Sequence, residues 1–190
     1  MKYLTKISRR KFVNTTMAAT TMSLMPSMQL FASDKPSSKA LKLAEKHREE
    51  LLDLLKKLIS VQSIQGESAA NAQQVVKDYL SKLPYRLEDS SDRPSLYEDH
   101  AEYMAPNPAG DGPFVNIVGW PKKQKGKQFA MFSHIDTHSI EEGWTTNPLE
   151  PKLVGNKLYG LGTSDDKGGV AAMLVAATIL AKKGKSLPVV

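Results

Sequence analysis

Residues 169–181 form a segment that is apolar on nearly every side of a helix. Its apolar residues are Val170, Ala171, Ala172, Met173, Leu174, Val175, Ala176, Ala177, Ile179 and Leu180. A helix without a polar face has to be covered by other parts of the chain, so the segment predicts a buried helix. Lys182, Lys183 and Gly184 follow it and supply positive charge and a C-cap. The fold must therefore place other elements around this helix.

Short apolar runs elsewhere predict strands. Residues 114–119 read as a strand, and residues 128–133 read as a buried strand that follows a basic hairpin turn at 122–127. A short strand at 157–159 belongs to a hairpin that leads toward the buried helix. Residues 187–190 resemble the beginning of another strand.

Two further helices are predicted before these strands. Residues 40–59 carry leucines at helical spacing among Lys and Glu, which indicates an amphipathic helix. Residues 60–66 end it, and residues 67–83 form a second helix that stops before Pro84. His47 lies in the first helix and is interpreted as a surface histidine rather than a metal ligand.

The elements together predict the α/β class, with a mixed, mostly parallel sheet and helices on both faces. Residues 85–113 fit this fold poorly, because they are long, polar and rich in proline. They could include a short edge strand at 85–87. His100 lies in this segment beside Glu98 and Asp99, where a solvated loop is favoured over a second metal site.

Residues 1–32 are expected to be a targeting segment outside the fold. A basic head is followed by small and apolar residues, and residues 8–13 (SRRKFV) resemble the twin-arginine export signal. The apolar part is only modestly hydrophobic and contains Pro26, so it is a poor transmembrane span. We expect an exported protein, periplasmic or secreted; a basic disordered tail is the alternative.

The positive charge of the chain is concentrated in that segment. The whole chain has a formal net charge of +6, but residues 1–32 hold five basic and no acidic residues. The remainder has 21 basic and 20 acidic residues, so the charge does not indicate nucleic acid or a membrane surface as a partner. The chain has no cysteine, which excludes disulfides and thiolate ligands. Any metal must be held by histidine and carboxylate groups.

His134, Asp136 and His138 follow the strand at 128–133 at alternate positions. In an extended chain, alternate side chains share one face. Imidazole and carboxylate groups are zinc ligands, and a carboxylate can instead orient a ligating histidine. By itself, the pattern also fits the end of an ordinary surface strand.

The second candidate motif is DDKGG at residues 165–169, where the buried helix begins. Gly160 and Gly162 allow a tight turn before it. Asp165 and Asp166 lie where negative charge is favoured by the helix dipole. By spacing alone they are either a helix cap or metal ligands.

The order of these features resembles the zinc-dependent metallopeptidase family of aminoacylase, acetylornithine deacetylase, succinyl-diaminopimelate desuccinylase and glutamate carboxypeptidase. It consists of an apolar strand, SHIDT, W-x-x-x-P-L, a short hairpin, and G-x-x-D-D-K-G-G before a helix. The likeness covers about residues 39–190 and is most specific over 132–169. Residues 1–32, 33–38 and 39–190 would then be a signal peptide, a linker and the N-terminal part of a catalytic domain.

The resemblance implies roles for three residues. His134 would bind one zinc ion, Asp165 would bridge two zinc ions, and Asp136 would be the active-site aspartate that holds His134. Cobalt is a conceivable substitute for zinc. The chain departs from the family at His138, where an apolar residue is usual, and at Leu161, where a basic residue is common.

The resemblance also implies hydrolysis of an amide bond in an N-acyl amino acid or small peptide. In the family, a general-base glutamate, the remaining zinc ligands and a dimerising domain follow in later segments. We therefore expect this chain to be the front part of a longer enzyme, inactive by itself and dimeric, if at all, through a later domain.

Two alternatives stay open. The chain could be a non-catalytic binding domain on the same fold. It could also be a mononuclear metal hydrolase that uses His134, Asp136 and His138.

Overall fold

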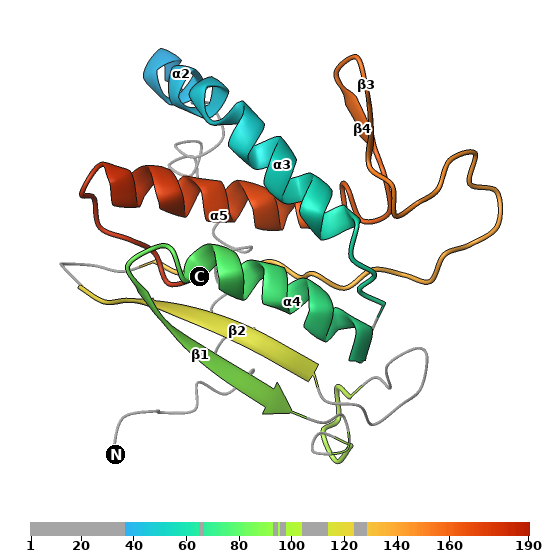
Figure 1. The fold of residues 1–190 in the computed structure, drawn as a ribbon. Coiled ribbons are helices and arrows are strands. Elements are labelled where there is room, and N and C mark those ends of the chain that lie inside the picture. The colour runs from blue at the N-terminus through green and yellow to red at the C-terminus, as the bar shows by residue number, and fades with distance from the viewer. Residues whose placement is uncertain (1–36, 65–66, 93–94, 96–97, 104–113, 124–128) are drawn as a thin grey trace, which may run out of the picture. The chain divides into compact units, whose positions relative to one another are not determined.

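A computed structural model describes residues 37–64, 67–92, 95, 98–103, 114–123 and 129–190 (Figure 1). The expected targeting segment and most of the linker lie outside these residues. So do most of the basic turn before 129 and the end of the long polar segment, residues 104–113. Predictions for these parts stay predictions. None of the helices described is long and apolar enough to cross a membrane.

The described elements follow one another in a mixed order of helices and strands. They are α2 (Ser38–Lys46), α3 (Arg48–Ile59), α4 (Glu67–Leu80), β1 (Tyr85–Asp92), β2 (Phe114–Pro121), β3 (Lys152–Val154), β4 (Lys157–Tyr159) and α5 (Lys167–Lys182). The chain divides into two compact units at Leu43. The structure describes only residues 37–42 of the first unit, in the first turns of α2, and all other elements belong to the second.

The single helix expected at 40–59 is interrupted at His47, which separates α2 from α3. His47 Nδ1 lies 2.8 Å from Glu50 Oε2 in the first turn of α3. The side chain of His47 is partly buried, more so than the interpretation as a surface histidine implied, but among the described residues it belongs to no group that could hold a metal ion. The amphipathic pattern is otherwise confirmed, because α3 buries Leu54, Leu55, Leu58 and Ile59 on one face.

The β1–β2 ladder is antiparallel and pairs Tyr85 with Pro121 at one end and Asp92 with Phe114 at the other. The sequence predicted only a short strand at 85–87. The strand is longer because β2 offers a partner along its whole length. In Figure 1, α4 lies along this ladder, and its buried residues Ala72, Val76 and Leu80 belong to the core.

Residues 189–190 pair with β2 on one side and with residues 129–131 on the other. Gly119 N–H donates to Val190 O at 2.6 Å, and Val190 N–H donates to Gly119 O at 3.1 Å. Met131 N–H donates to Val189 O at 2.8 Å. The strand beginning expected at 187–190 therefore does pair with its neighbours.

The prediction of a buried strand at 128–133 is not confirmed for the residues described. Only Ala130 forms a bridge, in parallel with Val189, while Phe129 is exposed and Phe132 is 88% exposed. Burial of such a run requires neighbours on both faces, and in the described part of the chain only one segment pairs with it. The apolar sequence predicted a buried strand, whereas the structure has a single bridge there and leaves Phe129 and Phe132 exposed.

The α/β class expected from the sequence is confirmed. Among the described residues, both ladders are antiparallel, and parallel pairing is limited to the bridges Ile64–Thr137 and Ala130–Val189. The sheet is mixed in this sense. The predominance of parallel strands that the sequence suggested is not seen in this part of the chain.

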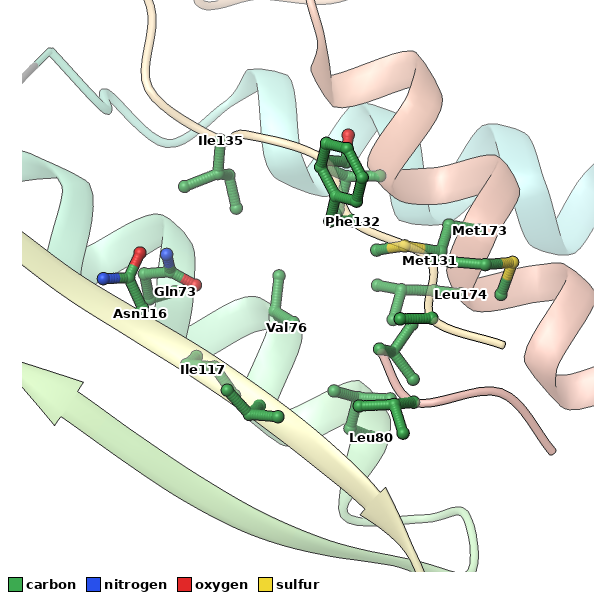
Figure 2. A pocket seen from close by; sticks show the side chains of 16 residues that line it. Gln73, Val76, Leu80, Asn116, Ile117, Met131, Phe132, Ile135, Met173 and Leu174 are labelled. Carbon is green, nitrogen blue, oxygen red and sulfur yellow. The ribbon is translucent and has the colours of Figure 1, made fainter. Parts of the chain in front are cut away.

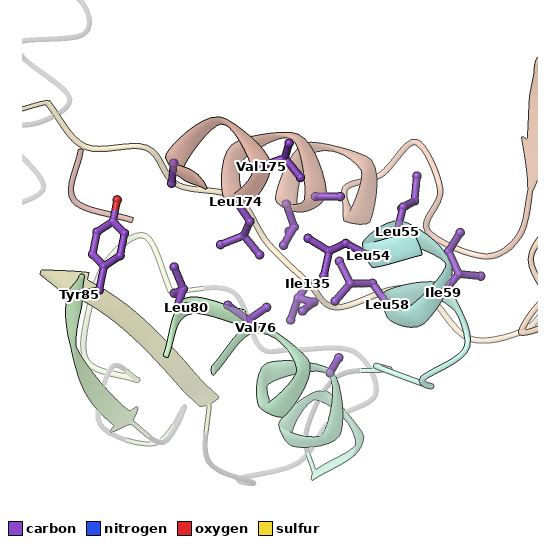
Figure 3. Packing of buried hydrophobic residues seen from close by; sticks show 14 of the residues in the cluster. Leu54, Leu55, Leu58, Ile59, Val76, Leu80, Tyr85, Ile135, Leu174 and Val175 are labelled. Atoms are coloured by element: carbon purple, nitrogen blue, oxygen red, sulfur yellow. The ribbon is translucent and has the colours of Figure 1, made fainter. Parts of the chain in front are cut away.

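The hydrophobic core lies between α3, α4 and α5 (Figure 3). Helix α5 buries Val170, Ala171, Leu174, Val175 and Ala177, as its apolar sequence predicted. It packs against α3. Residues 129–138 form the extended segment that carries His134, and Figure 3 shows its Ile135 pointing into the same cluster. The site-bearing segments are therefore attached to a packed core.

A short hairpin brings the chain to the beginning of α5. Strands β3 and β4 pair antiparallel through Lys152–Tyr159 and Val154–Lys157, as predicted. The turn that follows contains Gly162 at φ +74°, where a Cβ atom would approach Thr137 Cγ2 to 2.6 Å. This turn places Asp165 beside the segment that carries His134.

Candidate metal centre

His134 and Asp165 come from segments 31 residues apart and meet in space. His134 Nε2 lies 2.9 Å from Asp165 Oδ1. The two side chains are 53% and 82% exposed, so both remain open to solvent. The structure thus brings together the two residues that the resemblance named as metal ligands.

Asp136 approaches the other nitrogen of the same ring. Its Oδ1 lies 3.3 Å from His134 Nδ1. Partial burial lowers the pKa of His134, but the hydrogen bond to Asp165 and the charge of Asp136 outweigh it, so its pKa is raised. The imidazole is therefore held between two carboxylates, one on each nitrogen.

His138 does not complete a cluster with these residues. It is exposed, and no three His, Asp or Glu side chains within the described ranges gather closely enough to hold a metal ion. The triad of His134, Asp136 and His138 is thus not formed, although the three share alternate positions. The same finding gives no support to a second metal site at His100.

Asp166 is not a helix cap of the usual kind. It occupies the N-cap position of α5 but makes no side-chain capping hydrogen bond. Its carboxylate instead accepts a hydrogen bond from Ser133 Oγ, next to His134. A Cβ atom at Gly169 would collide with this carboxylate, so the glycine leaves room for it. The peptide bond between Asp165 and Asp166 is cis.

Lys167 is fully buried, although it follows two aspartates. Its Nζ donates to Leu58 O at 2.8 Å and to Val61 O at 2.9 Å. Burial lowers the pKa of the Lys167 amine to about 8. These carbonyls lie at and just beyond the C-terminal end of α3, where the helix dipole favours a cation. Sequence reasoning placed Lys167 in a motif but missed this role.

Ser63 is a second buried polar residue that sequence reasoning missed. Its Oγ donates to Ile135 O at 2.8 Å, and its carbonyl accepts from Thr137 N–H at 2.9 Å. The hydroxyl of Thr137 is buried without a hydrogen-bond partner among the residues that the structure describes. No local pattern marks Ser63, because its partners lie more than 70 residues away.

A cavity of about 290 Å³ lies beside the site, between α4, β2, α5 and the extended segment (Figure 2). Its walls are mainly apolar, and Figure 2 shows Val76, Ile117 and Leu174 around it. Gln73 and Asn116 add polar groups to the lining. The cavity shares Ser133 with the surroundings of Asp166 but does not include His134 or Asp165.

The donor atoms at the site suit a divalent ion of the zinc type. Zinc in proteins is held by imidazole nitrogen and carboxylate oxygen when cysteine is absent. His134 and Asp165 offer one of each within hydrogen-bond distance of each other, and Asp136 can orient the ring. The residues present therefore fit part of a zinc site.

The sequence is similar to known hydrolases. The profile of Peptidase family M20/M25/M40 matches residues 130–190. Succinyl-diaminopimelate desuccinylase of Rhizorhabdus wittichii is 30% identical over 68% of this chain and 30% of the relative. N-formyl-4-amino-5-aminomethyl-2-methylpyrimidine deformylase of Bacillus subtilis is 30% identical over 77% of this chain and 32% of the relative. The chain thus spans about a third of the length of these relatives.

The fold is similar to that of a solved dipeptidase. The crystal structure of human carnosine dipeptidase 1 matches 76% of this chain and 31% of its own, with a TM-score of 0.56 and 23% sequence identity. At this identity, the match supports the fold only.

Proposed function

The chain belongs to peptidase family M20/M25/M40, and we propose on this basis that it forms part of a zinc-dependent hydrolase of amide bonds. The observation that carries the proposal is the approach of His134 Nε2 to Asp165 Oδ1 at 2.9 Å. Two segments far apart in the sequence place an imidazole and a carboxylate together on an exposed surface. Neither side chain is needed there to fill the core.

Each of three residues has a defined part in this proposal. His134 would bind a zinc ion through Nε2, the atom that faces Asp165. Asp136 would accept the proton on Nδ1 and so keep the ring in the tautomer that ligation requires. Asp165 would bind through its carboxylate and bridge to a second ion. Zinc bound here would supply Lewis-acid activation of water and of a carbonyl group.

The proposed activity belongs to a protein that completes this site. Zinc sites use three or four protein ligands, whereas the described residues bring two donors together. We expect the 190-residue chain alone to bind metal weakly and to show no turnover. Further ligands and a general base would come from other segments of the whole protein.

The proposed substrate is an N-acyl amino acid or a small peptide. The relatives are named as a desuccinylase and a deformylase, and the fold match is a dipeptidase. Removal of an acyl group from nitrogen and cleavage of a dipeptide are both amide hydrolysis. Residues 8–13 further support export of the protein, to the periplasm or beyond, because they resemble a twin-arginine signal.

Metal binding by the purified chain tests the proposal. Equilibrium dialysis against Zn²⁺ should show binding that is lost in His134→Ala and in Asp165→Asn. His138→Ala is the matched control, because it removes an exposed histidine from the same segment and should retain the metal. Loss of the metal in His138→Ala would favour the mononuclear triad instead.

Hydrolysis is tested separately from metal binding. Binding without turnover, followed by turnover once segments that carry further ligands and a general base are supplied, is the expected result. A chain that binds no zinc with wild-type His134 and Asp165 would contradict the assignment of the ligands. In that case the non-catalytic binding domain becomes the better interpretation.

A further inference from the structure

The chain just after Asp165 is anchored to the end of α3. Lys167, two residues beyond Asp165, donates from Nζ to Leu58 O at 2.8 Å and to Val61 O at 2.9 Å. The Lys167 side chain is fully buried, so water does not compete for these bonds. The residues that flank Asp165 make two further contacts, from Ser133 Oγ to the Asp166 carboxylate and from Lys167 N–H to Gly162 O at 3.0 Å. Of these contacts, the Lys167 ammonium is the one that connects the chain beside Asp165 to the end of α3.

The segment that carries His134 is anchored to the same loop. Ser63 donates from Oγ to Ile135 O at 2.8 Å. Its main-chain oxygen accepts from Thr137 N–H at 2.9 Å. These two contacts lie on either side of Asp136 and begin one residue after His134. Ser63 is also fully buried. The loop thus fixes the extended chain at the point where it presents the imidazole.

We propose that the end of α3 and the loop of residues 60–64 set the separation of His134 and Asp165, with Ser63 and Lys167 as positioning residues. The proposal rests on the metal site proposed above. Neither residue touches the candidate ligands through its side chain. Each acts through the main chain of the segment that carries a ligand.

The physical reason is the difference in burial between the anchors and the ligands. Hydrogen bonds in a low-dielectric interior are strong and costly to leave unmade. Exposed side chains such as His134 and Asp165 exchange their partners for water at little cost. Because both segments are anchored to the same buried part of the chain, the packed interior can fix the distance between the exposed side chains of His134 and Asp165.

The test uses the metal-free chain first. The ring nitrogens of His134 report its contacts with Asp165 and Asp136 in long-range ¹H–¹⁵N spectra. The chain has four histidines, and the His134 signals are identified by their absence in His134→Gln. Ser63→Ala and Lys167→Met should each move these signals toward those of an exposed histidine. The double variant should add little, because both residues act through one loop.

Tyr85→Phe is the matched control. It also removes one buried hydrogen bond to a main-chain carbonyl, from Tyr85 Oη to Pro188 O at 3.0 Å. Its loss should reduce stability without moving the His134 signals, because Tyr85 lies on β1 and contacts neither ligand segment through this bond. The control separates positioning from a general loss of stability.

Co²⁺ titration gives a second readout of the same variants. Ser63→Ala should weaken Co²⁺ binding about 10-fold and alter the visible spectrum of the bound ion, as changes to residues that orient metal ligands do. If wild type binds no Co²⁺, the proposed function fails, and the His134 signals still decide the present proposal. If Ser63→Ala is folded and leaves the signals in place, or if Tyr85→Phe moves them equally, the proposal is overturned. Should Lys167→Met not fold, Ser63→Ala decides alone.

Discussion

Asp165 and Lys167 are two residues apart at the beginning of α5 and lie in opposite environments. Lys167 is fully buried and gives its ammonium protons to carbonyls of Leu58 and Val61. Asp165 is 82% exposed and meets only His134 in the described contacts. The comparison shows that a residue of the packed interior and an exposed candidate ligand can be only two positions apart in the chain. Stability and ligand chemistry should therefore respond to different substitutions.

The largest loss of stability is expected at the end of α3. Leu58 is fully buried, and Leu58→Ala should lower the free energy of unfolding by about 2–5 kcal/mol, because a cavity remains where the side chain packed. Urea denaturation measures the change. Leu41→Ala, at a leucine that is more than half exposed, is the control and should change little. A loss in Leu58→Ala as small as that in Leu41→Ala would mean that α3 is not part of the core.

A smaller loss is expected in the turn before Asp165. Gly162 has φ +74°, and a Cβ atom there would lie 2.6 Å from Thr137 Cγ2. Gly162→Ala should therefore cost about 1–3 kcal/mol of stability from backbone strain and collision. Gly143→Ala is the control, because Gly143 has φ +98° but open space around it. A similar cost at Gly143 would assign the whole effect to φ and none to the contact with Thr137.

Glu50 is an intermediate case, a partly buried carboxylate with partners. Burial raises its pKa, but hydrogen bonds from His47 and Tyr79 and the charge of Lys182 outweigh it, so the pKa lies below its usual 4.5. A lowered folded pKa stabilises the fold above pH 4.5, and this contribution is lost as pH falls through the folded value. The stability advantage of wild type over Glu50→Gln should thus be present at pH 7 and shrink in acid.

Denaturation curves from pH 7 to pH 3 measure this advantage. Glu49→Gln, at the exposed neighbouring position, is the control because it removes the same charge without removing a buried contact. An advantage of wild type over Glu50→Gln that grows in acid would mean that burial, rather than the partners, dominates at Glu50.

The smallest change in stability is expected at Asp165. Asp165→Asn alters an exposed side chain, so the free energy of unfolding should move by about 0.5 kcal/mol or less. The same variant should lose the metal in dialysis. A large loss of stability would show that Asp165 supports the fold, and the contrast with Lys167 would then fail.

Local patterns predicted the elements whose character depends on their own sequence. The apolar run of α5, the strand β2 and the β3–β4 hairpin were found in this way. The length of β1 and the exposure of Phe132 were not, because each depends on which segment lies beside it. The strand or helix propensity of a segment follows from its own sequence, whereas its burial depends on the segments that pack against it.

The same distinction applies to the candidate site, where some residues could be predicted from the sequence and others could not. The order of motifs named His134, Asp136 and Asp165, and the structure places them together, while their roles in metal binding remain predictions. Ser63 and the burial of Lys167 could not be predicted, because their partners are 72 and more than 100 residues away. Such contacts follow from the packing of α3 against α5, which no local pattern encodes.

The pairing of Val190 with Gly119 bears on how this chain behaves in a concentrated solution. Successive residues of a ladder direct their main-chain groups to opposite sides, so Ile117, two residues before Gly119, presents N–H and C=O on the side where Gly119 meets Val190. In the described part of the chain, those groups of Ile117 border the apolar cavity without a main-chain partner on that side. An open edge beside apolar walls attracts extended peptide segments. We therefore expect the β2 edge beside this cavity to be a place where extended segments of other molecules can pair in concentrated solution.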